Sequence, residues 1–207
     1  MNDFSVGMAL FDYIPVAFFA IGAIILLGDL YNKMSKAAFA LFAAGVIDVA
    51  MAGALKATWK LLYAAEVGDV TALNAMFFPV QSIGFLLAGI GIILMLCKKG
   101  SGTKNFSVVP VVSITFPYLV LVMVAGLGCL DTGLCILAKK MKKPGVIAIF
   151  AASFVCCLGM GYLSTKDFEQ AAMNWIAEGV NFVGQGLFLL GVWMLHKAGL
   201  ANLELDK

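Results

Sequence analysis

The sequence contains no arginine. All fourteen basic residues are lysines, against twelve acidic residues, so the formal net charge is +2. Arginine is the side chain that holds phosphates and carboxylates through two parallel hydrogen bonds, and its absence excludes recognition of that kind. The sequence also lacks a basic face with interleaved aromatic side chains, so no nucleic-acid partner is expected.

Charged residues of either sign are scarce. They make up 13% of the 207 residues, whereas 62% are hydrophobic, and the mean hydropathy is +1.00. A soluble domain carries about 25% charged residues. So few charges cannot cover a surface in water, so the lipid bilayer of a cell membrane is the expected solvent. The sequence therefore predicts an all-α integral membrane protein.

Groups that bind metals are also lacking. His196 is the only histidine, and the five cysteines contain no C-x-x-C pair. Zinc and haem sites need several nitrogen or sulfur ligands at close spacing, so no cofactor is expected. The cysteines are interpreted as small apolar packing residues. The N-terminal residues 1–13 are acidic rather than basic, which is unlike a secretory signal peptide, so the first apolar run is expected to stay as a span.

Six apolar segments are long enough to cross a membrane, which needs about 20 mostly apolar residues. They cover roughly residues 13–31, 37–55, 77–97, 114–138, 145–163 and 175–195. Residues 106–116 precede the fourth span and are followed by Pro117, which breaks a helix there. They are interpreted as an extended or interfacial segment, with a short re-entrant piece as the alternative.

The two halves of the chain resemble each other. Residues 74–95 match residues 174–195 at an offset of 100, residues 39–45 match 147–153 at an offset of 108, and Asp29 matches Asp131 at an offset of 102. The sequence therefore predicts one membrane domain built from two three-helix repeats, residues 1–105 and 106–207. Since three spans is an odd number and no extra span separates the halves, the second half is expected to be inverted relative to the first.

Lysines bear on the orientation in the membrane. If the N-terminus is cytoplasmic, eight lysines fall in inside loops and six in outside loops, and the dense cluster at residues 139–143 lies inside. Because inside loops are enriched in lysine and arginine, this distribution favours both termini on the cytoplasmic side.

A polar stripe runs along the last predicted span. Asn174, Glu178, Asn181 and Gln185 follow one another at steps of four, three and four, which places them on one helical face. Such a face fits a water-lined pathway or a polar-substrate site, and a polar seam between helices is the alternative. Gln81 is the repeat partner of Asn181, and inverted symmetry would place these two near opposite membrane faces.

Two carboxylates, Asp48 and Asp131, lie well away from the ends of their predicted spans. Asp48 lies close to the bilayer midplane, where an acidic residue costs about 2.5–3.5 kcal/mol on insertion scales. The small residues Ala44, Gly45 and Ala52 lie on its helix face, so Asp48 is expected to face the bundle. Asp131 lies about 10 Å inside the apolar boundary of its span. Both are expected to bind or relay a cation or proton, with interhelical hydrogen bonding as the alternative.

These features favour a small transporter or channel for a small polar solute or ion. Its pathway would be lined by Glu178, Asn181, Gln185 and Gln81, and titration of Asp48 or Asp131 would couple transport to a proton or cation. Glycine- and alanine-rich faces exceed what one six-helix bundle needs, which is compatible with a homo-oligomer. Two alternatives stay open: a membrane-embedded enzyme that acts on lipid with Asp29 and Asp131 as an acid/base pair, and a non-catalytic accessory or scaffold subunit.

Overall fold

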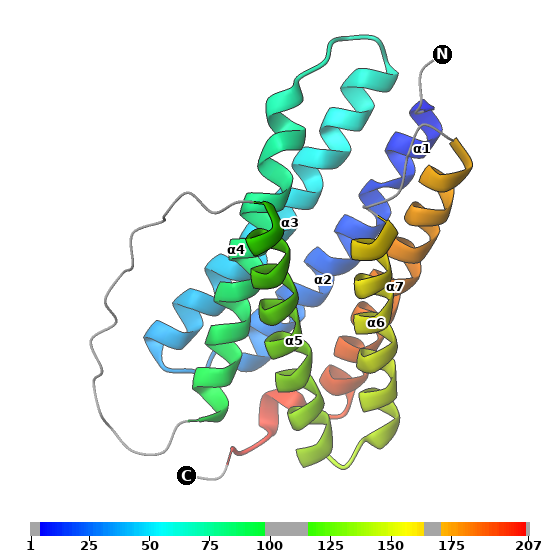
Figure 1. Cartoon of the computed structure of the whole chain (residues 1–207). Helices are drawn as coiled ribbons and strands as arrows, with labels where there is room; N and C mark the ends of the chain where they lie inside the picture. The colour runs from blue at the N-terminus through cyan, green and yellow to red at the C-terminus, as the bar shows by residue number, and fades with distance from the viewer. Residues whose placement is uncertain (1–4, 98–115, 164–170, 206–207) are drawn as a thin grey trace.

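The structure, a computed structural model, describes residues 5–97, 116–163 and 171–205, and every regular element in these ranges is helical (Figure 1). Asp12 ends α1 and begins α2, so these two helices form one rod with a joint at Asp12. The elements in chain order are α1 Val6–Phe11, α2 Tyr13–Leu30, α3 Lys36–Ala64, α4 Thr71–Leu96, α5 Phe116–Lys140, α6 Pro144–Leu163, α7 Ala171–Lys197 and the short 3-10 helix η1 Leu200–Asn202.

Five helical segments are long and apolar enough to cross a membrane. They are Val6–Leu30, Lys36–Ala64, Thr71–Leu96, Tyr118–Lys140 and Met173–Lys197, while the apolar stretch of α6, Pro144–Met160, is shorter. These lengths agree with a multi-pass membrane protein. Each of the six spans expected from the sequence overlaps one of α2 to α7. Residues 106–115, expected to be interfacial or re-entrant, lie outside the described residues.

The helices pack as a ring held by close backbone contacts. Each helix from α2 to α7 packs against the next one along the chain, and α7 packs against α2. Glycines allow the closest approaches, because a Cβ atom on Gly45 of α3 would lie 2.5 Å from the Gly84 carbonyl oxygen of α4. A Cβ on Gly89 of α4 would lie 2.5 Å from the Gly126 carbonyl oxygen of α5. Small residues at these crossings let helix backbones touch, as is typical of membrane bundles.

Helices α4 and α5 run in the same direction. Gly89 lies against Gly126, and further along both helices Ile92 lies against Gly133. Helices α2 and α7 are parallel in the same way, because the ring of Phe18 lies 5.3 Å from that of Phe182 and Asp29 contacts His196. We call the end of the bundle where α2, α4, α5 and α7 begin the N end, and the end where they finish the C end.

This arrangement differs from the inverted halves expected from the sequence. Inverted halves require α4 and α5 to run in opposite directions, whereas α2–α3–α4 and α5–α6–α7 follow the same series of directions. The expectation assumed that the chain stays at one membrane face between the third and fourth spans. The end of α4 and the start of α5 instead lie at opposite ends of the bundle, and residues 98–115 between them are outside the described part.

The termini also differ from the expectation that both lie on the cytoplasmic side. Figure 1 shows α1, the first described helix, and η1, the last one, at opposite ends of the bundle. At the C end, Lys33 after α2 donates to the carbonyl oxygens of Ala201 and Leu203 after α7, at 2.9 and 2.6 Å. The described chain therefore starts at the N end and finishes at the C end.

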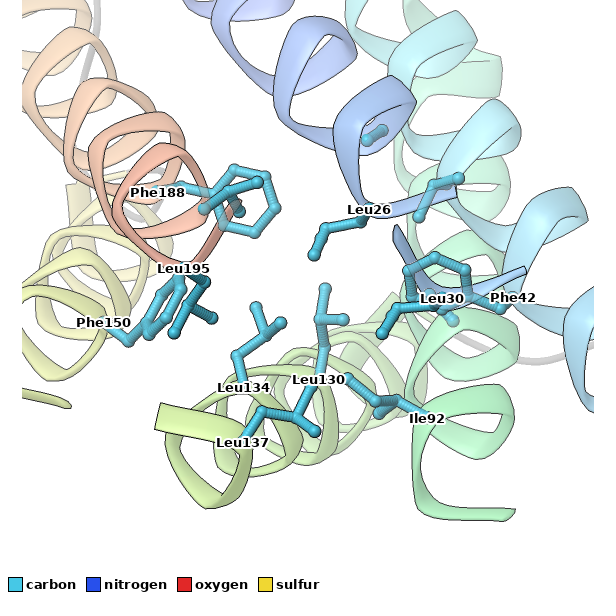
Figure 2. Close-up of a cluster of buried hydrophobic side chains, with 14 of the residues drawn as sticks. Leu26, Leu30, Phe42, Ile92, Leu130, Leu134, Leu137, Phe150, Phe188 and Leu195 are labelled. Carbon is cyan, nitrogen blue, oxygen red and sulfur yellow. The ribbon is translucent and has the colours of Figure 1, made fainter. Parts of the chain in front are cut away.

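A closed apolar core fills the half of the bundle nearest the C end. Side chains from every helix from α2 to α7 meet there (Figure 2). The members that we call the closed core are Leu26, Leu30, Phe42, Ile92, Leu130, Leu134, Leu137, Phe150 and Leu195, all of them fully buried.

Candidate functional site

A cavity of about 140 Å³ lies in the half of the bundle nearest the N end. Its wall takes residues from each helix between α2 and α7, and those from α4 and α7 lie in the first two-thirds of their helices. A buried water needs roughly 10–15 Å³ by this kind of measure, so the cavity has room for on the order of ten waters. The space therefore suits a small solute.

Four of the residues expected to line a pathway surround this cavity. Glu178, Asn181 and Gln185 reach it from α7, and Gln81 reaches it from α4. Their stripe faces inward because α7 turns that side toward the centre of the bundle. Gln81 and Asn181 were expected near opposite membrane faces, but they lie around one cavity because the two halves run in parallel. Whether these side chains carry a solute stays a prediction.

A buried cluster of three charges forms part of the cavity wall. The Lys60 ammonium lies 2.9 Å from Asp12 Oδ2 and also contacts Glu178 Oε1. The three residues are only 7%, 6% and 4% exposed, respectively. Removing ions from water costs several kcal/mol for each ion, and mutual attraction offsets this only when the geometry is good. We call Asp12, Lys60 and Glu178 the charge triad.

Local structure holds the charge triad in place. Ser5 Oγ accepts a hydrogen bond from the Met8 backbone N–H at 3.2 Å, which caps α1 and fixes the residues leading to Asp12. The hydroxyl groups of Tyr13 and Thr58 lie 2.8 Å apart and join α2 to α3 next to the triad. The parts of the chain that contain Asp12, Lys60 and Glu178 are far apart in the sequence, and they meet at this cluster.

Asp131 lies on the side of the cavity that faces the C end. It lies one helical turn past Leu127, which is part of the cavity wall. Asp131 is 6% exposed, and neither of its carboxylate oxygens has a hydrogen-bond partner in the described ranges. An unpartnered carboxyl group in such surroundings is costly, which makes Asp131 the least satisfied polar side chain of α5.

Asp48 is placed apart from the other predicted site residues. It is half-buried on α3 and does not line the cavity, although its neighbour Val49 does. Gly45 and Ala52 on its helix are buried, whereas Ala44 is exposed. The structure thus brings four of the six predicted site residues together and leaves Asp48 and Asp131 outside the cavity wall.

Asp29 and Asp131, the acid/base pair of the lipid-enzyme alternative, differ in their contacts. Asp29 at the C end is held by His196 Nδ1, which lies 3.0 and 3.1 Å from its two carboxylate oxygens. Asp131 has no such partner among the residues that the structure describes. The two repeat-related carboxylates therefore have different surroundings and no contact with each other.

Two members of the charge triad could not be recognised from the stripe on α7. Asp12 precedes the predicted first span, and Lys60 falls in the segment that follows the predicted second span. One signal was present: Val49, Gly53, Lys56 and Lys60 repeat the same steps of four, three and four along α3, and all of them line the cavity. Because α3 continues to Ala64, Lys56 and Lys60 lie within the helix and on the face that lines the cavity.

Comparison of the chain with protein-family models, with curated proteins and with solved structures finds no match, so its function rests on the geometry of this cavity.

Proposed function

We propose that the protein carries a small polar solute across a membrane through the cavity. The observation that carries this proposal is a central cavity with charged and amide groups in its wall, bounded toward the C end by the closed core. Ionisable groups inside a membrane bundle are costly and mark solute or ion pathways by default. Cavities between repeated halves are where transporters of this type hold their substrates.

Matching contacts in the two halves support a pair of parallel repeats. Gly45 of α3 lies against the Gly84 carbonyl, and the counterpart Ser153 Oγ of α6 donates to the Gly184 carbonyl at 2.9 Å. A second pair follows the same offsets, since Phe42 packs on Gly91 and Phe150 packs on Gly191. Transporter halves can be related by an axis along the membrane normal, and parallel repeats fit that class.

The cavity uses equivalent positions of both halves. Phe78, Gln81 and Phe85 of α4 line it, as do Glu178, Asn181 and Gln185 of α7, each exactly 100 residues later. Helices α4 and α7 therefore present the same face to the cavity. The second copy carries a carboxylate and an amide where the first carries phenylalanines, so one side of the cavity is apolar and the other polar.

The lysines give this arrangement an orientation. Seven lysines of the described residues lie at the C end, and the two at the N end, Lys56 and Lys60, point into the cavity wall. The seven are Lys33, Lys36, Lys139, Lys140, Lys142, Lys143 and Lys197. By the positive-inside rule the C end is cytoplasmic, and the cavity lies toward the opposite side.

Single cysteines test this orientation. In a variant whose five native cysteines are replaced by alanine, Val67→Cys at the exposed α3–α4 connection is expected to react with a membrane-impermeant maleimide on intact cells. Glu204→Cys, exposed at the C end, is expected to react only after the cells are permeabilised. Labelling of both sites from the same side would contradict the parallel halves, and the reversed pattern would contradict the orientation.

Transport is tested with purified protein in lipid vesicles. Uptake is measured for urea, glycerol, amino acids, amines, carboxylates, Na⁺ and K⁺. We expect saturable uptake of one solute class, reduced about tenfold by Gln185→Leu, because a closed site loses one hydrogen bond. Val183→Leu changes a half-exposed residue of the same turn and is the matched control. Folded protein that moves none of these solutes would reject the proposal. In that case, turnover of lipid by the protein would favour the enzyme alternative, and no turnover would favour the scaffold alternative.

A further inference from the structure

One ammonium group in the cavity wall has no carboxylate beside it. Lys56 lines the cavity, and its Nζ lies over the ring of Phe77, 4.2 Å from the ring centroid. Within the described ranges, no carboxylate lies within ion-pair distance of Lys56, because both carboxylates of the charge triad are taken by Lys60. A cation over an aromatic face is held but not neutralised, so Lys56 remains able to bind an anionic group.

One carboxylate oxygen in the same wall also lacks a partner. Glu178 uses Oε1 to contact Lys60, while its buried Oε2 has no hydrogen-bond partner among the residues described. Glu178 is 4% exposed, so bulk water does not satisfy this oxygen. A buried acceptor without a donor is costly. Glu178 lines the cavity, so a rotation of its carboxylate would bring this oxygen to a ligand ammonium group.

The two groups are separated by the length of a small ligand. Lys56 and Lys60 are four residues apart on α3, about 6 Å along the helix axis. Since Glu178 contacts Lys60 and all three residues line one small cavity, the Glu178 carboxyl group and the Lys56 ammonium group border the same space. A molecule that carries a carboxylate and an ammonium on the same carbon atom can therefore reach both.

The fixed charges of the wall favour a ligand without net charge. Lys56 and Lys60 contribute two positive charges, and Asp12 and Glu178 contribute two negative charges, so the wall is neutral. An added cation or anion would bring an uncompensated charge into a poorly solvated site, which is expensive. A neutral solute without charges would leave both Lys56 and Glu178 Oε2 unmatched. A zwitterion avoids both costs.

The rest of the wall suits an apolar side chain. Phe19, Phe78, Phe85 and Met160 also line the cavity. The volume of about 140 Å³ admits a ligand that replaces on the order of ten waters. We propose that the cavity binds a small zwitterionic amino acid, with its carboxylate on Lys56, its ammonium on Glu178 and its side chain among the phenylalanines. This inference rests on the proposed function, of which it names the substrate class.

The test measures binding to the purified full-length protein in detergent by titration calorimetry and thermal shift. The probes are alanine and leucine as zwitterions, alaninamide as a cation, N-acetylalanine as an anion and propionamide as a neutral amide. We expect the zwitterions to bind and to raise the melting temperature by mass action. Lys56→Met is expected to weaken alanine binding about 10- to 100-fold, since one charge-assisted hydrogen bond is lost.

A reversal of preference separates recognition from mere structural damage. Lys56→Met leaves the wall with one net negative charge, so the cation alaninamide is expected to bind this variant more tightly than alanine does. Lys56 makes no ion pair with any described residue, so its replacement leaves the charge triad intact. Lys36→Met, an exposed change at the C end, is the control and is expected to leave alanine binding unchanged.

The outcomes distinguish this inference from the proposed function. Equal binding of propionamide or of a single ion would overturn the zwitterion site while leaving transport of another solute in place. Zwitterion binding without uptake into vesicles would overturn transport and leave the site. Failure of every zwitterion to bind the folded protein would overturn the inference.

Discussion

Replacing Lys60 by methionine is expected to destabilise the protein by about 3–5 kcal/mol, the largest loss that we expect from any single change in the cavity wall. Lys60 is the cation that lies between Asp12 and Glu178, and both carboxylates are buried. Without it, two negative charges face each other with no cation in ion-pair contact. The melting temperature in detergent, measured with and without the change, gives the effect.

A variant that lacks all three charges of the triad provides the control for Lys60→Met. The triple variant Asp12→Asn, Lys60→Met, Glu178→Gln removes all three charges together and is expected to regain most of the stability that Lys60→Met alone loses. Such a cycle isolates the coupling between contacting residues from the effect of each change. Lys36→Met changes an exposed lysine at the C end and is expected to leave the melting temperature unchanged. A Lys60→Met protein as stable as the parent would show that the charge triad is not formed.

Replacing Asp131 by leucine is expected to stabilise the protein by about 1–3 kcal/mol, the desolvation penalty of an unsatisfied buried polar group. Both oxygens of Asp131 lack partners among the described residues, and the leucines of the closed core lie on the same helix face. Leucine fills a similar space without a polar atom. The melting temperature is therefore expected to rise, which is unusual for a change inside a core.

The repeat partner of Asp131 supplies the matched control. Asp29→Leu removes a carboxylate that His196 holds, so this change is expected to lower the melting temperature. If Asp131 relays a proton or cation, as its position in the sequence predicts, Asp131→Leu also abolishes uptake into vesicles while it raises stability. Raised stability with unchanged uptake would show that Asp131 takes no part in transport. A lowered melting temperature would show that Asp131 has a partner after all.

The helices and the face of α7 were predictable because they depend on local pattern. Apolar length marks each span, and the spacing of Glu178, Asn181 and Gln185 marks one face of one helix. The charge triad was not predictable in this way, because Lys60 and Glu178 are 118 positions apart in the chain. Periodicity shows which face of a helix is polar, but it does not show which helices are neighbours.

The direction of the second half could not be obtained from the spans alone. Matching segments such as residues 39–45 and 147–153 reveal a repeat but carry no sign of orientation in the membrane. That orientation depends on which face of the membrane the chain reaches between α4 and α5. The lysines contain this information only after helix directions are known. All fourteen divide eight to six in the expected arrangement, whereas seven of the nine in the described ranges lie at the C end.

The closed core limits the rate at which such a protein could move a solute. Leu26, Phe42, Leu130 and Phe150 come from four different helices, and each is fully buried. No single side chain rotation opens such a layer, so whole helices have to slide or tilt, which takes roughly microseconds to milliseconds. Each cycle would pass one molecule, and the rate would saturate and fall sharply on cooling, unlike the steady current of an open pore.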